Sequence, residues 1–173
     1  MKIGIFDSGI GGATVLKEIF KLLPDEEYIY YSDSKNNPYG DKSQKEIINF
    51  SENIVNFLIK QECEIIVIAC NTASANAASY LRAKYSTIPI VAIEPAYKMV
   101  NDYAINDAAL VLATKATIES EKFTKLYQTY DNNKTTILEC VGLADLIENE
   151  KNLEIDKYLQ KYLSKYSGKV KSV

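Results

Sequence analysis

The sequence predicts an α/β protein, a parallel-sheet three-layer sandwich followed by an incomplete second domain of similar type. Strand-like runs rich in Ile, Val and Tyr alternate with segments whose apolar residues recur at helical spacing, which is the pattern of βαβ units. No Pro/Gly/Ser-rich linker or low-complexity tract interrupts the 173 residues. From the motifs we expect a first α/β domain over residues 1–97 and a partial second α/β domain over residues 98–173.

The expected elements alternate along the chain. Ser43 followed by Glu46 is a capping box that opens a helix, and Ile47, Phe50, Ile54 and Leu58 then share one helical face. Pro24 ends the preceding helix, and Pro89 lies where a strand begins. Strands are expected at residues 2–6, 28–32, 65–69, 90–93 and 110–113, and helices at residues 13–23, 43–60 and 73–84.

Two further segments have a clear pattern. Residues 65–69 are apolar throughout, as in a central strand that is covered on both faces. Leu and Tyr recur at helical spacing over residues 153–166, and Gly168 follows at a position typical of a helix C-cap. Residues 169–173 then alternate polar and apolar like the opening of another strand. Because nothing completes that unit, we expect truncation, either in the gene or in the expressed polypeptide.

Composition excludes several functions. A net charge of -3 and a pI near 5.2 provide no basic field for nucleic acid, and the lysines of residues 157–171 alternate with apolar residues as on a solvated helix face. No apolar run reaches the roughly 20 residues of a membrane span, and residues 1–6 are too short for the apolar core of a signal peptide. We expect a cytoplasmic protein that binds neither nucleic acid nor membrane.

The cysteines and the lack of histidine narrow the chemistry. Cys63, Cys70 and Cys140 are odd in number and widely spaced, which argues against a disulfide framework and against a zinc site of CxxC type. The chain contains no histidine, so imidazole-based metal sites, Ser/His/Asp triads and Cys/His dyads are excluded within it. We expect no metal.

Three polar clusters follow strands, where parallel sheets bind their ligands. The first, residues 7–12, has glycines at positions 9, 11 and 12, which is not the GxGxxG spacing of a dinucleotide site. Asp7 would also repel a pyrophosphate, whereas a carboxylate in a glycine-lined turn suits the ammonium group of an amino acid. The alternative is a tight loop with a helix-capping Asp. The second cluster covers residues 33–40.

The third cluster contains Cys70, which ends an apolar strand and precedes Asn71, Thr72 and Ser74, residues that can open a helix. The amides and dipole of a helix N-terminus favour a thiolate, so we expect a lowered pKa that makes Cys70 a usable base. Cys63 and Cys140 are interpreted as small buried apolar residues.

Five motifs, in order along the chain, resemble those of the glutamate racemase family. They are Asp7-Ser8-Gly9 with Gly11-Gly12, the Pro38-Tyr39-Gly40 turn, the run Ala69-Cys70-Asn71-Thr72-Ala73-Ser74, Glu94-Pro95-Ala96, and the pair Thr114 and Thr117. The resemblance implies two similar α/β domains with D- or L-glutamate between them and no pyridoxal phosphate, metal or other cofactor. It implies conversion of L- to D-glutamate for peptidoglycan synthesis.

By this resemblance Cys70 exchanges the Cα proton of the substrate on one face, and Asp7 assists the thiol. The same resemblance assigns the substrate's amino and carboxylate groups to the first-domain residues Asp7, Ser8, Pro38, Tyr39, Gly40, Asn71 and Thr72, and to Thr114 and Thr117 of the second domain. Inversion at Cα needs a base on one face and an acid on the other, so two thiols are required. Donors such as Asn71 and Thr72 would stabilise the developing charge.

The sequence departs from the family in one motif. The second catalytic cysteine of the family lies in Gly-Cys-Thr-His, which is absent here, and Cys140 resembles a structural position instead. We therefore expect an incomplete site with little or no racemase activity. We also expect incomplete sheets, whose exposed edges favour a homo-oligomer.

Two other interpretations stay open. The chain is a single-cysteine relative, such as an aspartate racemase or a decarboxylase of the same superfamily, or it only binds an acidic amino acid or a partner protein without catalysis. Pocket shape decides between glutamate and aspartate, and the residues alone do not reveal it.

Overall fold

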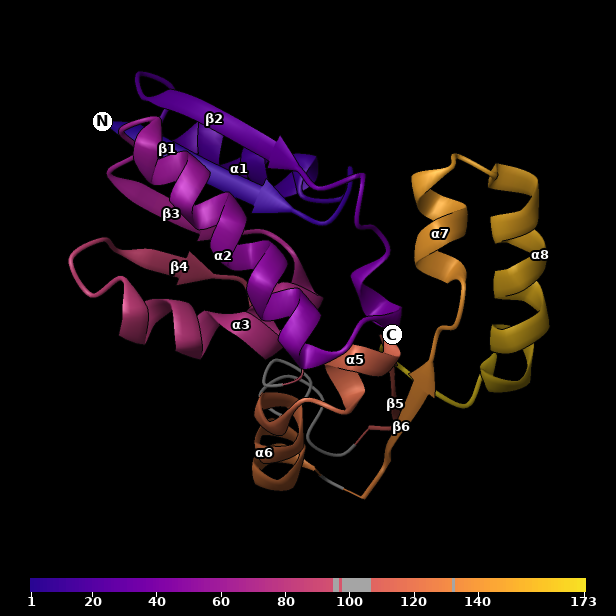
Figure 1. Cartoon of the computed structure of the whole chain (residues 1–173). Coiled ribbons are helices and arrows are strands. Elements are labelled where there is room, and N and C mark those ends of the chain that lie inside the picture. Colours follow the sequence, from indigo (N-terminus) through magenta and orange to yellow (C-terminus); the bar gives the residue numbers. More distant parts are fainter. Residues whose placement is uncertain (95–96, 98–106, 132) are drawn as a thin grey trace. The chain divides into compact units, whose positions relative to one another are not determined.

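The chain divides into two compact units, Met1–Glu94 and Pro95–Val173, in the computed structural model (Figure 1). Residues 1–94, 97, 107–131 and 133–173 are described. The boundary expected between residues 97 and 98 adjoins residues 98–106, which lie outside the described part, as do Pro95 and Ala96 of the fourth motif. Each unit is considered by itself below.

The first unit is a four-stranded parallel sheet with strand order β2-β1-β3-β4. Its sequence-predicted strands and helices are all present, with ends within a few residues of those expected. The elements are β1 (Lys2–Asp7), α1 (Ala13–Leu22), β2 (Glu27–Ser32), the 3-10 turn η1 (Tyr39–Asp41), α2 (Gln44–Lys60), β3 (Ile65–Ile68), α3 (Asn71–Lys84) and β4 (Ile90–Ala92).

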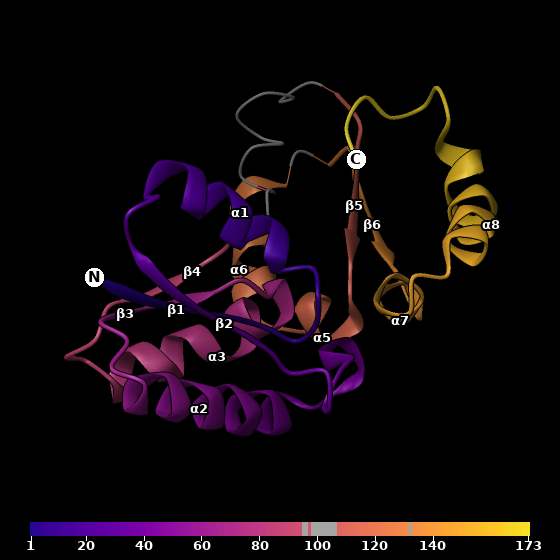
Figure 2. The same cartoon turned by 90° about the horizontal axis from the view of Figure 1, so that it is seen from above.

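Helices cover both faces of this sheet, which confirms the predicted three-layer sandwich. Figure 2 shows α1 on one side of the strands and α2 and α3 on the other. Ile3, Ile5 and Val67 face α1, where partly buried apolar side chains of that helix pack on them. On the opposite face, a Cβ at Gly4 would lie 3.0 Å from both Leu58 of α2 and the Cys63 sulfur, so these side chains pack closely against the strand and would have to shift to admit a larger residue.

The α2 helix begins at the predicted capping box. The backbone N–H of Ser43 donates to Glu46 Oε2 at 2.9 Å, and the backbone N–H of Glu46 donates to Ser43 Oγ at 3.3 Å. The Ser43 hydroxyl also donates to Glu46 Oε2 at 2.6 Å, and this bond together with that from the Ser43 N–H holds the pKa of the Glu46 carboxyl below its usual value. On the face that the helical period predicts, Ile47, Ile54 and Leu58 are buried. The inward face of α2 is therefore set by local sequence.

The second unit contains two parallel strands, β5 (Ala109–Ala113) and β6 (Thr135–Glu139). The predicted strand at 110–113 and the C-terminal helix are confirmed, the latter as α8 (Asn152–Leu163) followed by the 3-10 turn η2 (Ser164–Tyr166). Residues 115–148 were assigned no elements from the sequence, yet they form β6 and three helices, α5 (Lys115–Ile118), α6 (Glu121–Tyr130) and α7 (Leu143–Glu148).

The last residues of the chain run beside β5. Gly168 has a positive φ of 71°, which glycine adopts without strain and which reverses the chain after η2. Lys171 N–H then donates to Ala108 O at 2.8 Å, and Leu110 N–H donates to Ser172 O at 2.9 Å. The strand-like alternation of residues 169–173 therefore corresponds to a short parallel bridge between Ala109 and Ser172.

One buried hydroxyl of the first unit has no hydrogen-bond partner among the described residues. Ser51 lies on the inner face of α2 with a fully buried side chain, and its Oγ is unsatisfied. Ser74 of α3 is equally buried, but its Oγ donates to Ile68 O at 3.3 Å. A buried hydroxyl without a partner costs stability, whereas a bonded one contributes to it.

We predict that Ser51→Ala keeps or raises the free energy of unfolding, by up to about 1 kcal/mol, since it removes an unsatisfied group and adds helix propensity. The matched variant Ser74→Ala should lower it by about 1 kcal/mol. Urea unfolding followed by circular dichroism measures both. A loss of stability in Ser51→Ala as large as that in Ser74→Ala would contradict the prediction.

Candidate functional site

The first three strands of the first unit end side by side, and the polar clusters follow them. The register pairs Asp7 of β1 with Ser32 of β2 and Phe6 of β1 with Ile68 of β3. Backbone hydrogen bonds continue past the strand ends, because Asp33 N–H donates to Asp7 O at 3.0 Å and Ala69 N–H donates to Phe6 O at 2.8 Å. The loops after β1, β2 and β3 are thus held at one edge of the sheet.

Asp7 is buried at the end of β1 and organises the first loop. Its Oδ2 accepts a hydrogen bond of 2.7 Å from the backbone N–H of Gly12, at the start of α1. The carboxylate therefore supports the turn, as the alternative of a capping Asp expects. This hydrogen bond does not involve the second oxygen, Oδ1, so it does not prevent Oδ1 from contacting a ligand.

Gly12 is required where the loop passes Asp7. A Cβ at this position would lie 2.6 Å from Asp7 Cβ and 2.9 Å from Ala69 Cβ, distances that no real structure tolerates without movement. A Cβ at the neighbouring Gly11 would meet only Asp7 Oδ2, at an ordinary 3.5 Å. The two adjacent glycines therefore differ sharply in the space around them.

We predict that Gly12→Ala lowers the free energy of unfolding by about 1–3 kcal/mol, because overpacking displaces β1 and the residue after β3. Gly11→Ala is the matched control and should stay within about 0.5 kcal/mol of the parent chain. Urea titrations of the two variants provide the comparison. Equal stability of both variants would show that the loop yields freely.

The Cys70 thiol lies at the junction of β3 and α3. Cys70 is the N-cap residue of α3, and its sulfur accepts a hydrogen bond of 3.4 Å from Ala73 N–H. The same sulfur donates to Ser8 Oγ, also at 3.4 Å. Only 5% of the residue is exposed. The helix N-terminus at Cys70 is therefore present as the sequence predicts, and it comes with a partner from the loop after β1.

The expected lowering of the Cys70 pKa is wrong. Burial raises the pKa of this thiol, and the negative charge of Asp7 raises it further. Hydrogen bonds from Ser8 and from the Ala73 amide act in the lowering direction, as predicted for a helix N-terminus, but they are the smaller effects. The position at a helix N-terminus indicates the amides, but it does not reveal how far the sulfur is removed from water, and that effect is the larger one. The resting group is a thiol.

We predict that Asp7→Asn lowers the pKa of Cys70, because it removes a like charge while an amide oxygen can still accept from Gly12. The rate of Cys70 alkylation by iodoacetamide should then rise about tenfold at a fixed pH below the transition, which corresponds to about one pKa unit. Asp25→Asn, an exposed carboxylate in the loop after α1, is the control and should leave the profile unchanged. A shift to higher pH in Asp7→Asn would refute this account of the charge.

The second cluster is organised by Asp33, which the sequence placed at the start of this cluster without a role of its own. Asp33 is buried just after β2, and both of its carboxylate oxygens accept from Asn36 Nδ2, at 2.9 and 3.0 Å. Tyr39 donates its hydroxyl to Asp33 Oδ2. Burial and Asp33 together raise the pKa of Tyr39, so it remains a protonated donor. The signal available in the sequence was a carboxylate at a strand end, as for Asp7.

The remaining site residues predicted in the first unit are neighbours in sequence of Tyr39 or Cys70. Gly40 is buried beside Tyr39 in η1, and Pro38 precedes them, half-buried. Asn71 is exposed at the first position of α3, whereas Thr72 is buried and its carbonyl accepts from Asn76 Nδ2 at 2.9 Å. The structure therefore joins Asp7, Ser8 and Cys70 through the loop after β1, and it joins Tyr39 to Asp33.

Thr114 and Thr117 form a local pair in the second unit. Thr114 follows β5 and caps α5, where its Oγ1 accepts from Thr117 N–H at 3.3 Å. The two hydroxyls lie 3.0 Å apart. Thr114 thus directly follows the carboxyl end of a parallel strand, as Cys70 follows β3 in the first unit, and Thr117 lies in the helix that begins there.

The other two cysteines differ from Cys70. All three are free thiols within the described residues. Cys63 packs against Gly4 of β1, away from the carboxyl ends of the strands. Cys140 follows β6, but its sulfur turns back to the strand and contacts Leu138 O at 3.5 Å, and burial raises its pKa. Neither sulfur caps a helix, which agrees with their interpretation as buried apolar residues.

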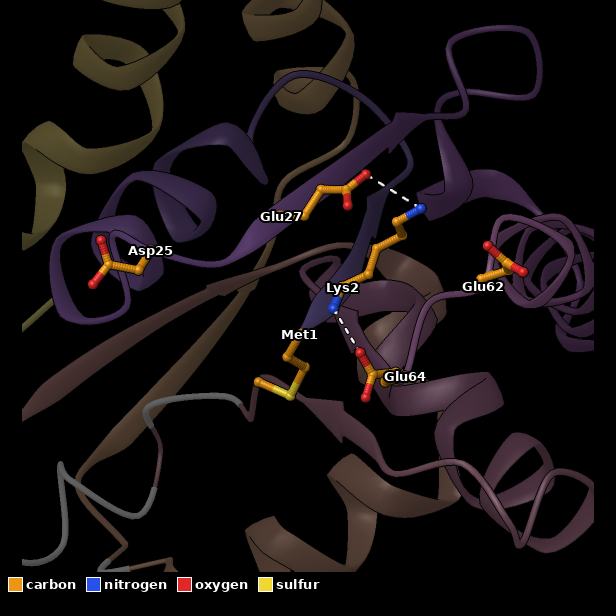
Figure 3. A pocket seen from close by; sticks show the side chains of 6 residues that line it. All are labelled: Met1, Lys2, Asp25, Glu27, Glu62 and Glu64. Atoms are coloured by element: carbon orange, nitrogen blue, oxygen red, sulfur yellow. Dashed lines mark hydrogen bonds and ion pairs between the residues drawn. The ribbon is translucent and has the colours of Figure 1, made fainter.

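An open depression of about 590 Å³ lies at the opposite, amino end of the first sheet (Figure 3). Lys2 provides its positive side chain, which pairs with Glu27 at 3.2 Å, while Lys2 N–H donates to Glu64 at 3.0 Å. The lining is otherwise mostly acidic, with Met1, Asp25 and Glu62 completing it. Carboxylates on that wall would repel an acidic ligand, so we assign the site to the carboxyl end.

The described ranges contain neither a candidate metal site nor a membrane-spanning helix. No group of three or more Cys, Asp or Glu side chains there is arranged to hold a metal ion. None of the helices described combines the length and the apolar composition needed to cross a bilayer.

The fold and the site define an α/β protein of two parallel-sheet units with a helix-capping thiol at the carboxyl end of the first sheet. No protein-family model matches the chain. A glutamate racemase of Clostridium perfringens strain SM101 is 45% identical over 167 residues, which is 95% of this chain and 64% of that protein. The chain thus spans less than two thirds of the length of this curated relative.

Solved structures agree. The glutamate racemase of Aquifex pyrophilus matches with a TM-score of 0.79 and 35% identity over 98% of this chain and 68% of its own. The Escherichia coli glutamate racemase, in complex with L-glutamate and the activator UDP-MurNAc-Ala, matches with a TM-score of 0.82 and 30% identity over 94% and 64% of the two chains. The chain belongs to the glutamate racemase family.

Proposed function

We propose that this chain supplies the first catalytic thiol of a glutamate racemase, and that Cys70 exchanges the Cα proton of glutamate on one face. The observation that carries the proposal is the Cys70 sulfur, which caps α3 and contacts Ser8 beside Asp7 at the end of the parallel sheet. Family membership supports the reaction, and the Escherichia coli relative was solved with L-glutamate bound.

The electrostatics of the site suggest how the thiol is activated. Burial and Asp7 keep Cys70 protonated in the free protein. An amino acid brings an ammonium group, and if this group binds near Asp7 it offsets the charge that opposes the thiolate. The pKa of Cys70 then falls only when substrate is present. The Cys70 S–H bond would break first, with its proton passing to solvent. The thiolate then takes the Cα proton, so the Cα–H bond breaks, an S–H bond forms and the electron pair of the broken bond stays on the substrate's α-carbon.

The other residues of the proposal hold the substrate. Asn71, at the exposed first turn of α3, and Thr72 would donate to the substrate carboxylate and so stabilise charge that develops on it. One wall of the site would consist of Pro38, Tyr39 and Gly40, of which Tyr39 bonds to Asp33. Thr114 and Thr117 would contact the substrate from the second unit. We propose that no cofactor takes part.

We place the reaction in the cytoplasm, where D-glutamate serves peptidoglycan synthesis and hence cell shape. Complete racemisation requires a second thiol on the other face of Cα. In the described part of the chain, Cys70 alone combines a strand end with a helix cap. We further propose self-association, since in the described residues of the second unit the sheet consists of β5 and β6 with a short bridge beside β5.

A second candidate is binding without turnover. Cys70 has a raised pKa, and among the described residues it is the one thiol that caps a helix. Both features favour a chain that holds an acidic amino acid at the same site without inverting it. Calorimetry with glutamate and aspartate, beside the variant Cys70→Ser, separates binding from chemistry and compares the two side-chain lengths.

We predict that the chain in D₂O exchanges the Cα proton of one glutamate enantiomer at most, and converts neither into the other, because one thiol reaches one face. Proton NMR measures the loss of the Cα signal, and chiral chromatography measures inversion. Cys70→Ser should abolish any exchange, while Cys140→Ala, the control for a buried thiol, should retain it. Conversion of both enantiomers at equal rates would refute the single-thiol account.

A further inference from the structure

Ser8 directly follows β1, and its side chain contacts Cys70, the residue that caps α3 after β3. Substrate binding alone does not explain this contact. The Ser8 hydroxyl lies 3.4 Å from the Cys70 sulfur, and it accepts the hydrogen bond that the thiol donates. The residue is half-buried, directly after β1. We propose that Ser8 is a positioning residue for the Cys70 thiol, which it orients when protonated and stabilises as a thiolate. The inference rests on the proposed function only for the catalytic importance of that thiol.

The register of β1 and β3 brings Ser8 and Cys70 together. Phe6 of β1 pairs with Ile68 of β3, and Ser8 and Cys70 each lie two residues further along these neighbouring strands. Ala69 N–H also donates to Phe6 O at 2.8 Å, which continues the pairing up to the site. The separation of the hydroxyl and the sulfur is therefore set by the sheet rather than by a mobile loop.

The two partners of the sulfur have different abilities. The Ala73 amide can only donate, so it always uses a sulfur lone pair. A serine hydroxyl both accepts and donates, so Ser8 can accept from the S–H and, after a rotation of its own hydrogen, donate to the thiolate. The backbone N–H of Ser8 also acts on the sulfur as a donor, and this group is kept when the side chain is changed. The neutral thiol therefore donates to the Ser8 hydroxyl and accepts from backbone amides, and in the thiolate the hydroxyl becomes a further donor.

The surroundings of the sulfur oppose the thiolate, so a hydrogen bond from Ser8 to the thiolate has a large effect to offset. Asp7 from β1 faces the thiol with a negative charge, and Tyr39 from η1 is near enough to interact with it electrostatically. Burial also disfavours the charged sulfur. Ser8 and the amides at the start of α3 are the groups that act in the opposite direction. Hydrogen bonds to charged groups are stronger than those between neutral ones, so loss of Ser8 should be measurable.

The experiment is the pH profile of Cys70 alkylation by iodoacetamide in the full chain without ligand. Mass spectrometry of the peptide that contains Cys70 separates it from Cys63 and Cys140. The midpoint of the profile reports the pKa of the thiol, and the plateau at high pH reports access to it. In Ser8→Ala the midpoint should rise by about one unit, so that the rate below the transition falls about tenfold.

Two variants frame the result. Ser8→Thr keeps a hydroxyl and should return the midpoint to that of the parent chain. Ser32→Ala removes a hydroxyl from the end of neighbouring β2, where it contacts Ser34 rather than Cys70, and should also match the parent. A midpoint in Ser8→Ala equal to that of Ser32→Ala would overturn the proposal, whatever happens to the plateau.

If Ser8→Ala does not fold, the parent chain itself provides the test. The infrared S–H stretching band of Cys70 is obtained as the difference between the parent and Cys70→Ser. A band shifted to lower frequency supports a thiol that donates a hydrogen bond, and a band at the frequency of an unbonded thiol overturns it. Both readouts are independent of glutamate, so failure of the proposed racemase chemistry would leave them unchanged.

Discussion

The parallel pairing of β1 with its two neighbours is the constraint on which the site depends. Parallel strands bring their carboxyl ends to one edge, and the bonds from Asp33 and Ala69 to the last residues of β1 extend that alignment into the loops. Asp7, Ser8 and Cys70 meet for this reason, although more than sixty residues separate the first two from the third. Without that register the contact between Ser8 and the Cys70 thiol would not form.

At this edge, opposing electrostatic effects act on a single sulfur. Low exposure and the carboxylate of Asp7 favour the thiol, while Ser8 and the first amides of α3 favour the thiolate. The balance lies on the side of the thiol in the free chain, which suits the proposed role of a group that reacts only with bound substrate. Asp7 also ties down the turn through Gly12, so the same carboxylate has a structural and an electrostatic effect.

Local patterns predicted the first unit well because its signals are local. The capping box at Ser43 and Glu46, the apolar face of α2 and the uniformly apolar β3 each depend on residues within one element. Residues 115–148 carry weaker signals. Ser120 caps α6 and Thr114 caps α5, but these helices are short, and β6 has the partly exposed pattern of a strand in a small sheet, which sequence periodicity alone did not distinguish.

The sequence by itself determined the α/β class, the parallel sheet of the first unit, and the candidate thiol, because periodicity, caps and the residues after a strand are properties of short segments. Only the tertiary structure revealed Asp33 as the anchor of Tyr39, Ser8 as the partner of Cys70, and the upward direction of the thiol pKa. These depend on which distant groups share a water-poor edge of the sheet. Desolvation and through-space charge act between residues far apart along the chain, so no local pattern encodes them.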